Sequence, residues 1–322
     1  MKAAVLSALD KPPRCEEFPD PRLKEGEALV RVRAAALKPI DRQLASGAHY
    51  ASQSNLPAVC GTDGVGTLDD GKRVFFAGSR PPYGAMAERT VVAAARCFPL
   101  PDNVDDVTAA AVFNPGSSAY GALKWRAQIA AGETVLVLGA TGVTGKLAIQ
   151  TAKLLGAGRV IAAGRNEEVL KTLAELGADS IILLDESGSE LSQAFAREAG
   201  TKGFDVVIDY LWGRPTEALL DAIGRNDFGA ASSRVRLVQV GESAGATISL
   251  PAGILRSSRL EILGAGSGSA PASREAWAEA IHWLLGNVAR GTLRIDTERV
   301  PLADVESAWG REWHGRRAVI IP

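Results

Sequence analysis

The feature that most constrains the fold is a repeated alternation of apolar and helix-like segments between residues 133 and 266. Six apolar runs occur in this order: ETVLVLG, RVIAAG, SIILL, FDVVIDY, VRLVQVG and LEILGAG. Helix-like segments such as KLAIQTAKLLG and NEEVLKTLAELG lie between them. The runs are not interrupted by regularly spaced polar residues, which is typical of strands buried on both faces, and their long connections allow parallel pairing. This region is therefore predicted to be an α/β domain with a doubly wound parallel sheet.

The rest of the chain has a different character. Residues 1–113 are rich in turns and in short strand-like runs such as ALVRVRAAAL and KRVFFAG. After about residue 268 only an amphipathic helix, SREAWAEAIHWLLGNVARG, and a few short pieces ending in RRAVIIP remain, which are too few for a domain. We therefore expect a first domain in 1–113, a nucleotide-binding domain in 114–267, and a return of 268–322 to the first domain. A length of 322 residues agrees with two domains.

A glycine-rich turn, GATGVTG, follows the first apolar run and opens a helix. In that context the backbone of a glycine turn can approach a pyrophosphate, whose charge faces N–H groups at the helix N-terminus. The spacing is GxxGxxG and not the standard GxGxxG, so a purely structural turn remains an alternative. The residues predicted to contact the pyrophosphate are Gly139, Ala140, Thr141, Gly142, Val143, Thr144 and Gly145.

The end of the second apolar run indicates which dinucleotide is bound. An acidic residue there would bind the adenosine ribose and repel a 2′-phosphate. The sequence has Gly164, Arg165 and Asn166 instead, and an arginine fork can hold a phosphate. NADP(H) is therefore favoured over NAD(H). The alternative is that Arg165 is a solvated residue before a helix that Asn166 caps.

Further cofactor contacts are expected where other predicted strands end, because ligands of open α/β sheets lie at the carboxyl ends of the strands. Leu211 follows the fourth run, and Val240 and Gly241 end the fifth. Trp212 could cover the adenine or pack in the core.

Charge and cysteine content exclude several classes of protein. Lys and Arg number 36 and Asp and Glu number 37, so the net charge of -1 favours neither a nucleic-acid partner nor an acidic tail. The N-terminal segment lacks the apolar stretch of a secretory signal, and no segment approaches the length of a membrane span. Three scattered cysteines without a CxxC pair indicate a reducing compartment, so a cytoplasmic location is expected.

The order of several segments resembles the medium-chain dehydrogenase/reductase superfamily. These segments are AAALKPIDRQLASGAHY, VCGTDGVGTL, YGAMAERTVV, NPGSSAYGAL and the final AVIIP, so the resemblance covers essentially the whole chain. It implies a GroES-like β-rich catalytic domain, interrupted by a Rossmann domain that binds the cofactor, with the active site between them.

Within this superfamily, the metal positions point to a zinc-independent protein. Zinc alcohol dehydrogenases carry a cysteine where Lys38 stands and a His-Glu pair where Thr62 and Asp63 stand. A protonated lysine is not a zinc ligand, and zinc needs at least three converging protein ligands. The resemblance is therefore to the zinc-independent quinone oxidoreductase branch, and no metal is predicted.

This branch implies a particular reaction. Without a Lewis acid, little stabilises the alkoxide of a simple ketone, whereas quinones and conjugated enones delocalise the charge. We expect hydride transfer from NADPH to a quinone or to the β-carbon of an α,β-unsaturated carbonyl. We also expect a homodimer, because the apolar edge strand LEILGAG should not be left in water.

Three residues of the first domain are candidates for catalysis. Tyr50 matches the tyrosine that the family has in its SG-x-Y segment beside the substrate, although a half-buried structural ring is possible. Lys38 could donate to a substrate carbonyl or pair with Asp41 or Asp63. Asp41 is expected to be an anchoring carboxylate, whose pKa a neighbouring lysine should lower.

The resemblance adds three residues to the cofactor site. Ser118 stands where the family has a hydroxyl residue near the nicotinamide, although it could equally cap a helix. Ala265 and Gly266 lie in the loop whose main chain approaches the nicotinamide in the family.

Two other functions stay open. GATGVTG also resembles the motif of atypical short-chain dehydrogenases, but those carry it near the N-terminus, and here more than 130 residues precede it. The second is a non-enzymatic NADP(H)-binding regulator or structural protein on the same fold.

Overall fold

The computed structural model describes residues 1–48, 52, 55–184, 188–224, 234–271 and 273–322. The chain divides into two compact units, which we treat separately. Unit 1 comprises Met1–Phe113 and Ala278–Pro322, and unit 2 comprises Asn114–Trp277. The second boundary follows Trp277, ten residues later than the predicted boundary at 267/268. Residues up to Trp277 belong to unit 2 because the Trp277 ring packs edge-on against Trp125, with centroids 5.3 Å apart.

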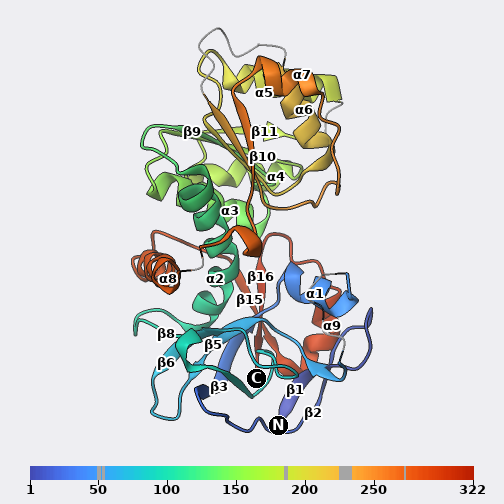
Figure 1. The fold of residues 1–322 in the computed structure, drawn as a ribbon, viewed down its shortest axis with the longest axis vertical. Coiled ribbons are helices and arrows are strands. Elements are labelled where there is room, and N and C mark those ends of the chain that lie inside the picture. Colours follow the sequence, from blue (N-terminus) through green and yellow to red (C-terminus); the bar gives the residue numbers. More distant parts are fainter. Residues whose placement is uncertain (49–51, 53–54, 185–187, 225–233, 272) are drawn as a thin grey trace. The chain divides into compact units, whose positions relative to one another are not determined.

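Unit 2 contains the predicted parallel sheet (Figure 1). Its order is β11-β10-β9-β12-β13-β14 and every neighbouring pair is parallel, which is the strand order of a dinucleotide-binding fold. The predicted α/β fold class is therefore confirmed. The strands are β9 (Thr134–Leu138), β10 (Arg159–Gly164), β11 (Ser180–Leu183), β12 (Val206–Asp209), β13 (Val235–Gln239) and β14 (Leu260–Gly264).

Helices cover both faces of this sheet, because successive strand residues point to opposite faces. On one face Leu136 and Ile161 pack with side chains of α5, α6 and α7, and on the other Val135 and Val160 pack with those of α3 and α4. The end of α2 and a π-helical turn, η2, complete the second face. The helical elements are α2 (Asp106–Tyr120), η2 (Gly121–Ala127), α3 (Val143–Leu154), α4 (Glu167–Thr172), η3 (Leu173–Leu176), α5 (Gly188–Ala199), α6 (Gly213–Gly224), α7 (Ala252–Ser257) and η4 (Ser267–Ser269).

Unit 1 is the β-rich part. Its small sheet has the order β2-β1-β4, and its larger sheet has the order β15-β16-β3-β5-β6-β8, with β7 also paired to β3. The predicted return of the chain is present, because β16 pairs antiparallel with β3 through Val319 and Ala36. The strands are β1 (Lys2–Leu6), β2 (Arg14–Glu17), β3 (Glu27–Ala36), β4 (Ala58–Val59), β5 (Asp63–Thr67), β6 (Arg73–Ala77), β7 (Arg89–Ala93), β8 (Cys97–Pro99), β15 (Thr297–Pro301) and β16 (Arg317–Ile321). The helical elements are α1 (Pro39–Ser46), η1 (Ala94–Arg96), α8 (Arg274–Ala289), which begins in unit 2, η5 (Leu302–Asp304) and α9 (Val305–Trp309).

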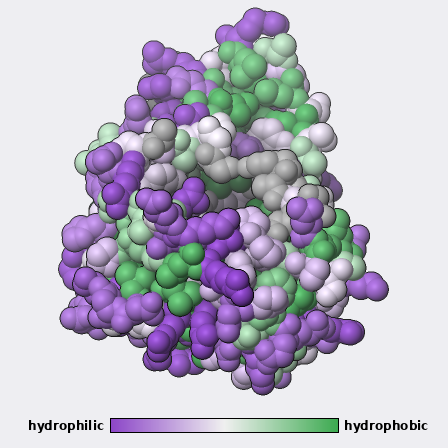
Figure 2. Space-filling model, turned by 60° about the horizontal axis from the view of Figure 1, so that its bottom comes forward, coloured by the Kyte–Doolittle hydropathy of each residue, from purple (hydrophilic) through white to green (hydrophobic). Residues whose placement is uncertain are grey.

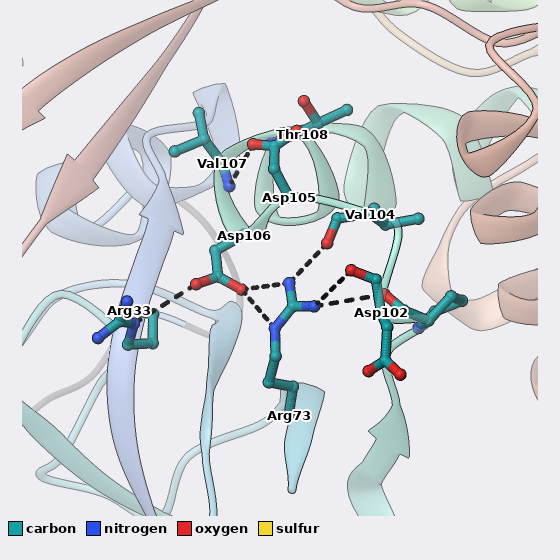
Figure 3. Close-up of polar contacts among 9 residues, drawn as sticks. Arg33, Arg73, Asp102, Val104, Asp105, Asp106, Val107 and Thr108 are labelled. Carbon is teal, nitrogen blue, oxygen red and sulfur yellow. Dashed lines mark hydrogen bonds and ion pairs between the residues drawn. The ribbon is translucent and has the colours of Figure 1, made fainter.

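Ionic contacts fix the start of α2, the helix that carries the chain from unit 1 into unit 2. Arg73 of β6 donates from Nε and Nη2 to one carboxylate oxygen of Asp106, at 3.1 and 2.7 Å, and Arg33 donates to the other at 3.4 Å (Figure 3). Asp105 caps the helix by accepting hydrogen bonds from two backbone N–H groups of its first turn, at 3.1 and 3.0 Å. The first turn of α2 is thus held by both a cap and a charge-assisted clamp.

Hydrophilic side chains predominate on the face of the molecule in Figure 2, where hydrophobic side chains form separate areas. Within the described ranges, no helix has the length and apolar content needed to cross a membrane.

Candidate active site

The predicted pyrophosphate turn lies between β9 and α3. Gly139 has a left-handed backbone (φ 85°), and a Cβ there would lie 3.1 Å from Cδ2 of Leu211. A Cβ on Gly145 would lie 2.3 Å from the carbonyl oxygen of Gly139, so α3 packs against the turn only if this residue is glycine. Close packing therefore accounts for these two glycines without any ligand.

Gly142 is different, because packing does not require it. It is exposed, and an added Cβ would meet nothing nearer than 3.5 Å. It is also the N-cap of the 12-residue helix α3, where no side chain caps the first-turn N–H groups. An uncapped helix start with open space above a glycine fits a pyrophosphate group.

The end of β10 lies beside this turn. A Cβ on Gly164 would lie 2.6 Å from Cγ2 of Thr141, so the two segments are in close contact. Arg165 is exposed, and no described residue bonds its guanidinium group. Asn166 caps α4, since its Oδ1 accepts a hydrogen bond from the N–H of Val169 at 3.0 Å. The capping role considered for Asn166 is therefore present, and it leaves the Arg165 side chain available to a ligand.

The other predicted cofactor residues follow neighbouring strands at the same edge. Leu211 follows β12, and Val240 and Gly241 follow β13. The N–H groups of Val240 and Gly241 donate to the Asp209 carbonyl at 2.8 and 3.1 Å. Ser118 lies beside the buried hydroxyl of Tyr210, and burial raises the pKa of that tyrosine.

After β14, Ala265 donates its N–H to the Gln239 carbonyl at 2.8 Å. The N–H of Gly266 donates to Oγ of Ser269 at 2.9 Å. The structure thus gathers the predicted cofactor residues of unit 2 at the carboxyl edge of one sheet, while their contacts with a cofactor stay predictions.

In unit 1, Lys38 lies inside a buried charge cluster. Only 1% of Lys38 is exposed, and its Nζ lies 3.1 Å from the Ala36 carbonyl, 3.0 Å from Oδ1 of Asp63 and 3.4 Å from Oδ2 of Asp41. Three acceptors match the three N–H bonds of an ammonium group. Of the two roles predicted for Lys38, the structure contains the pairing with Asp41 and Asp63, and donation to a substrate carbonyl stays a prediction.

Asp41 is the anchoring carboxylate of this cluster. It accepts hydrogen bonds from the backbone N–H groups of Lys38 at 2.9 Å and Thr62 at 3.1 Å, which ties α1 to the segment before β5. Burial raises the pKa of the Asp41 carboxyl above its ordinary value, although the Lys38 charge acts in the opposite direction. The expectation of a lowered pKa for Asp41 is wrong, because desolvation of a completely buried carboxylate outweighs the effect of the Lys38 charge.

Tyr50, the remaining predicted catalytic residue, lies outside the described residues, and its role stays a prediction. Within the part of the chain that the structure describes, no group of three or more His, Cys, Asp or Glu side chains could hold a metal ion.

Asp209, the last residue of β12, is completely buried at this edge of the sheet and is not among the predicted site residues. Its carboxylate accepts hydrogen bonds from the N–H groups of Leu211 at 2.8 Å and Trp212 at 2.9 Å. The signal was an acidic residue inside the apolar run FDVVIDY, since a buried carboxylate must be matched by donors.

Comparison with known proteins identifies the family. Residues 24–102 match the model described as alcohol dehydrogenase GroES-like domain, and residues 143–286 match the model described as zinc-binding dehydrogenase. The chain belongs to the medium-chain dehydrogenase/reductase superfamily, in its quinone oxidoreductase-like branch.

Individual relatives agree with this assignment. A probable NADPH-dependent quinone reductase of Emericella nidulans is 28% identical over all of both chains. A quinone oxidoreductase of Pongo abelii is 31% identical over 58% of this chain, and the match spans 58% of that relative's length. The structure of Escherichia coli quinone oxidoreductase complexed with NADPH superposes with a TM-score of 0.84 over all of both chains, at 24% identity, and shows the shared fold.

Proposed function

We propose that the protein is an NADPH-dependent oxidoreductase that transfers a hydride to a quinone or to an α,β-unsaturated carbonyl. The observation that carries this proposal is the carboxyl edge of unit 2, where the uncapped start of α3 and the exposed Arg165 lie in adjacent segments. The first suits a pyrophosphate and the second a 2′-phosphate. The Emericella nidulans relative, aligned over all of this chain, supports NADP(H) as the cofactor.

In this proposal the cofactor supplies the hydride, and the protein binds and orients it. First-turn N–H groups of α3 hold the pyrophosphate, and Arg165 holds the 2′-phosphate. In unit 1, the Lys38 cluster fixes α1 against the segment before β5 and keeps the backbone N–H of Thr62 in place.

The family model of residues 143–286 carries a zinc-binding description, but the donor set of this chain does not fit zinc. Lys38 stands where zinc relatives have a cysteine ligand, and its buried ammonium is already paired with Asp63 and Asp41. A second cation at this place would be repelled by the ammonium and would lack ligands. We therefore propose a zinc-independent reaction, for which quinones and enones are the suitable acceptors because they delocalise the transferred charge.

The function is tested by NADPH oxidation with a panel of quinones, enals and enones, before and after treatment with a chelator. We expect turnover with at least one of these acceptors and an unchanged rate after chelation. A rate that falls on chelation and returns with zinc would contradict the zinc-independent reaction.

Arg165→Ala is expected to weaken NADPH binding by about 1.5–3 kcal/mol, the usual contribution of a charge-assisted hydrogen bond, and to leave NADH binding nearly unchanged. Titration with both cofactors measures the effect. Arg197→Ala, which removes an exposed arginine from α5, is the matched control and should change neither affinity. Equal losses for NADPH and NADH in Arg165→Ala would show that this residue does not bind the 2′-phosphate.

A non-enzymatic NADP(H)-binding protein is the second candidate, and one observation favours it. The ammonium of Lys38, a predicted substrate donor, has its acceptors within the protein. A protein that binds NADPH tightly but oxidises it with none of the acceptors above would support this candidate.

The short-chain dehydrogenase alternative has less support. The sequence contains the Tyr-x-x-x-Lys pair typical of that class, at Tyr120 and Lys124. Tyr120 is only 2% exposed and packs edge-on against Trp125, with centroids 5.7 Å apart, so it cannot reach a substrate. The homodimer stays a proposal, supported by the position of β14 at an edge of the unit 2 sheet.

A further inference from the structure

The buried carboxylate of Asp209 is hydrogen-bonded by the loop that follows β12 and is not paired with a described cation. The residue is 0% exposed, and no described basic side chain forms an ion pair with it. Oδ1 accepts the two hydrogen bonds from Leu211 and Trp212, and Oδ2 accepts one from the hydroxyl of Thr216 at 2.5 Å. Such burial is tolerated only because donors surround the group, so the arrangement fixes the loop that follows β12.

Trp212 has an unusual backbone conformation within this loop. Its φ is 57°, in the left-handed region of the backbone that residues other than Gly, Asn and Asp rarely adopt. The hydrogen bond from its N–H to Asp209 holds it there. Residues in such conformations persist where the surroundings impose them, and they gather at ligand sites.

The same loop is joined to the loop after β13. Ala244 donates its N–H to the Leu211 carbonyl at 2.8 Å, and Ser243 donates its hydroxyl to the Tyr210 carbonyl at 3.0 Å. A Cβ on Gly213 would lie 2.6 Å from the Ala244 carbonyl, so the two loops are packed backbone to backbone. Leu211 also reaches the first glycine of the pyrophosphate turn, where an added Cβ would lie 3.1 Å from its Cδ2. The loop held by Asp209 therefore borders both other segments at the carboxyl edge of the sheet.

The Trp212 side chain is half-buried at this edge. It packs against the apolar core that α5, α6 and α7 form on one face of the sheet, and part of it stays exposed. A fixed, partly exposed indole at the carboxyl end of a parallel strand offers a flat surface to a flat ligand.

We propose that Asp209 is a positioning residue of the cofactor site and that Trp212 is the side chain it positions, as the surface against which the adenine of NADP(H) stacks. This proposal rests on the proposed function, which supplies the dinucleotide. It assigns to the loop after β12 the recognition of the base, distinct from the recognition of the phosphates by the glycine turn and Arg165.

A double-mutant cycle tests the proposal on the full chain. Trp212→Asn removes the ring but keeps a residue that tolerates the left-handed backbone. Trp212→Asn and Asp209→Ala should each raise the Kd for NADPH about tenfold, the size of a lost base–aromatic stack. Because Asp209 acts through Trp212, the double variant should also lose about tenfold, whereas independent effects would multiply to about a hundredfold.

Conservative variants and a control accompany the cycle. Asp209→Asn keeps a carbonyl acceptor for the loop and Trp212→Phe keeps a ring, so both should bind NADPH nearly as the unmodified protein does. Asp205→Ala is the matched control, because Asp205 accepts a hydrogen bond from the Thr134 N–H at 2.8 Å just before the start of the same strand. It should lower the melting temperature without changing the Kd of the folded protein.

Binding of the two halves of the cofactor provides the readout that a purely structural role would not give. In Trp212→Asn the affinity for 2′,5′-ADP should fall, and the affinity for reduced nicotinamide mononucleotide should not. Multiplicative losses in the cycle, or equal losses for both halves, would overturn the proposal while the unmodified protein still binds NADPH. Failure of the unmodified protein to bind NADPH would instead overturn the proposed function, and this inference with it.

Discussion

Lys38→Met is expected to lower the free energy of unfolding by about 3–5 kcal/mol, the cost of leaving buried charges without their partner. Lys38 is the cation between the Asp41 and Asp63 carboxylates, with Nζ–oxygen distances of 3.4 and 3.0 Å. Its removal takes away the cation paired with two carboxylates in the interior of unit 1, and the buried Arg317 guanidinium acts on them only through its charge, without an ion pair to either. Chemical denaturation measures the loss.

Two comparisons make this test specific. Lys72→Met is the matched control, because Lys72 pairs with Asp70 at 2.7 Å but its side chain is 75% exposed, and exposed pairs contribute little. The triple variant Lys38→Met, Asp41→Asn, Asp63→Asn should recover part of the lost stability, since it removes the charges together. A loss in Lys38→Met no larger than that in Lys72→Met would show that the cluster does not stabilise unit 1.

The pH dependence of Lys38→Met follows from the same cluster. In this variant the Lys38 charge no longer opposes desolvation, so the folded-state pKa of the Asp41 carboxyl rises further. A carboxyl group whose pKa is higher in the folded than in the unfolded state stabilises the fold at low pH. This stabilisation is lost as the pH rises above the pKa of the unfolded state, which is about 4. The stability deficit of the variant should therefore grow as the pH rises above about 4.

Gly145→Val is the second change with a large expected effect. A Cβ at this position would lie 2.3 Å from the Gly139 carbonyl oxygen and 2.6 Å from the Ala140 Cα, and both are backbone atoms that cannot turn aside. We expect α3 to shift away from β9, with a stability loss of about 3 kcal/mol and no measurable NADPH binding. Thermal unfolding and cofactor titration measure the two effects.

Gly142→Ala separates a ligand-binding turn from a structural one. An added Cβ at Gly142 meets nothing nearer than 3.5 Å, so the melting temperature should stay unchanged. NADPH binding should weaken, because the methyl group fills the space above the first-turn N–H groups of α3. Unchanged NADPH binding in Gly142→Ala would favour the alternative that the turn is only structural.

Much of the fold could be predicted because the strands of unit 2 carry their own signal. Runs such as VLVL and VVID are apolar on both sides, and only a sheet covered on both faces buries all of them. The boundary between the units was less accessible. It depends on the packing of Trp277 on Trp125, two residues far apart in sequence whose contact no local pattern reveals.

The site was predicted unevenly for a related reason. The glycine turn and Arg165 were predicted as cofactor residues because a local motif and its position after a strand mark them. The behaviour of Asp41 was not, because its pKa depends on how completely the fold buries it, whereas the sequence shows only that a lysine is near. Asp209 was missed since its donors come from a loop that only the folded chain brings to it.

The pairing of β16 with β3 affects how the chain folds during its synthesis on the ribosome. Leu37 donates its N–H to the Ala318 carbonyl at 2.9 Å, so the larger sheet of unit 1 joins residues separated by the whole of unit 2. Unit 2 is continuous in sequence, and domains of that kind can fold while the ribosome is still adding residues. Until β16 emerges, Ala35 and Ala36 at the end of β3 have no partner on that side, because β7 pairs only with Glu27–Arg31. We therefore expect the nascent chain to depend most on chaperones while its earliest strands await their last neighbour.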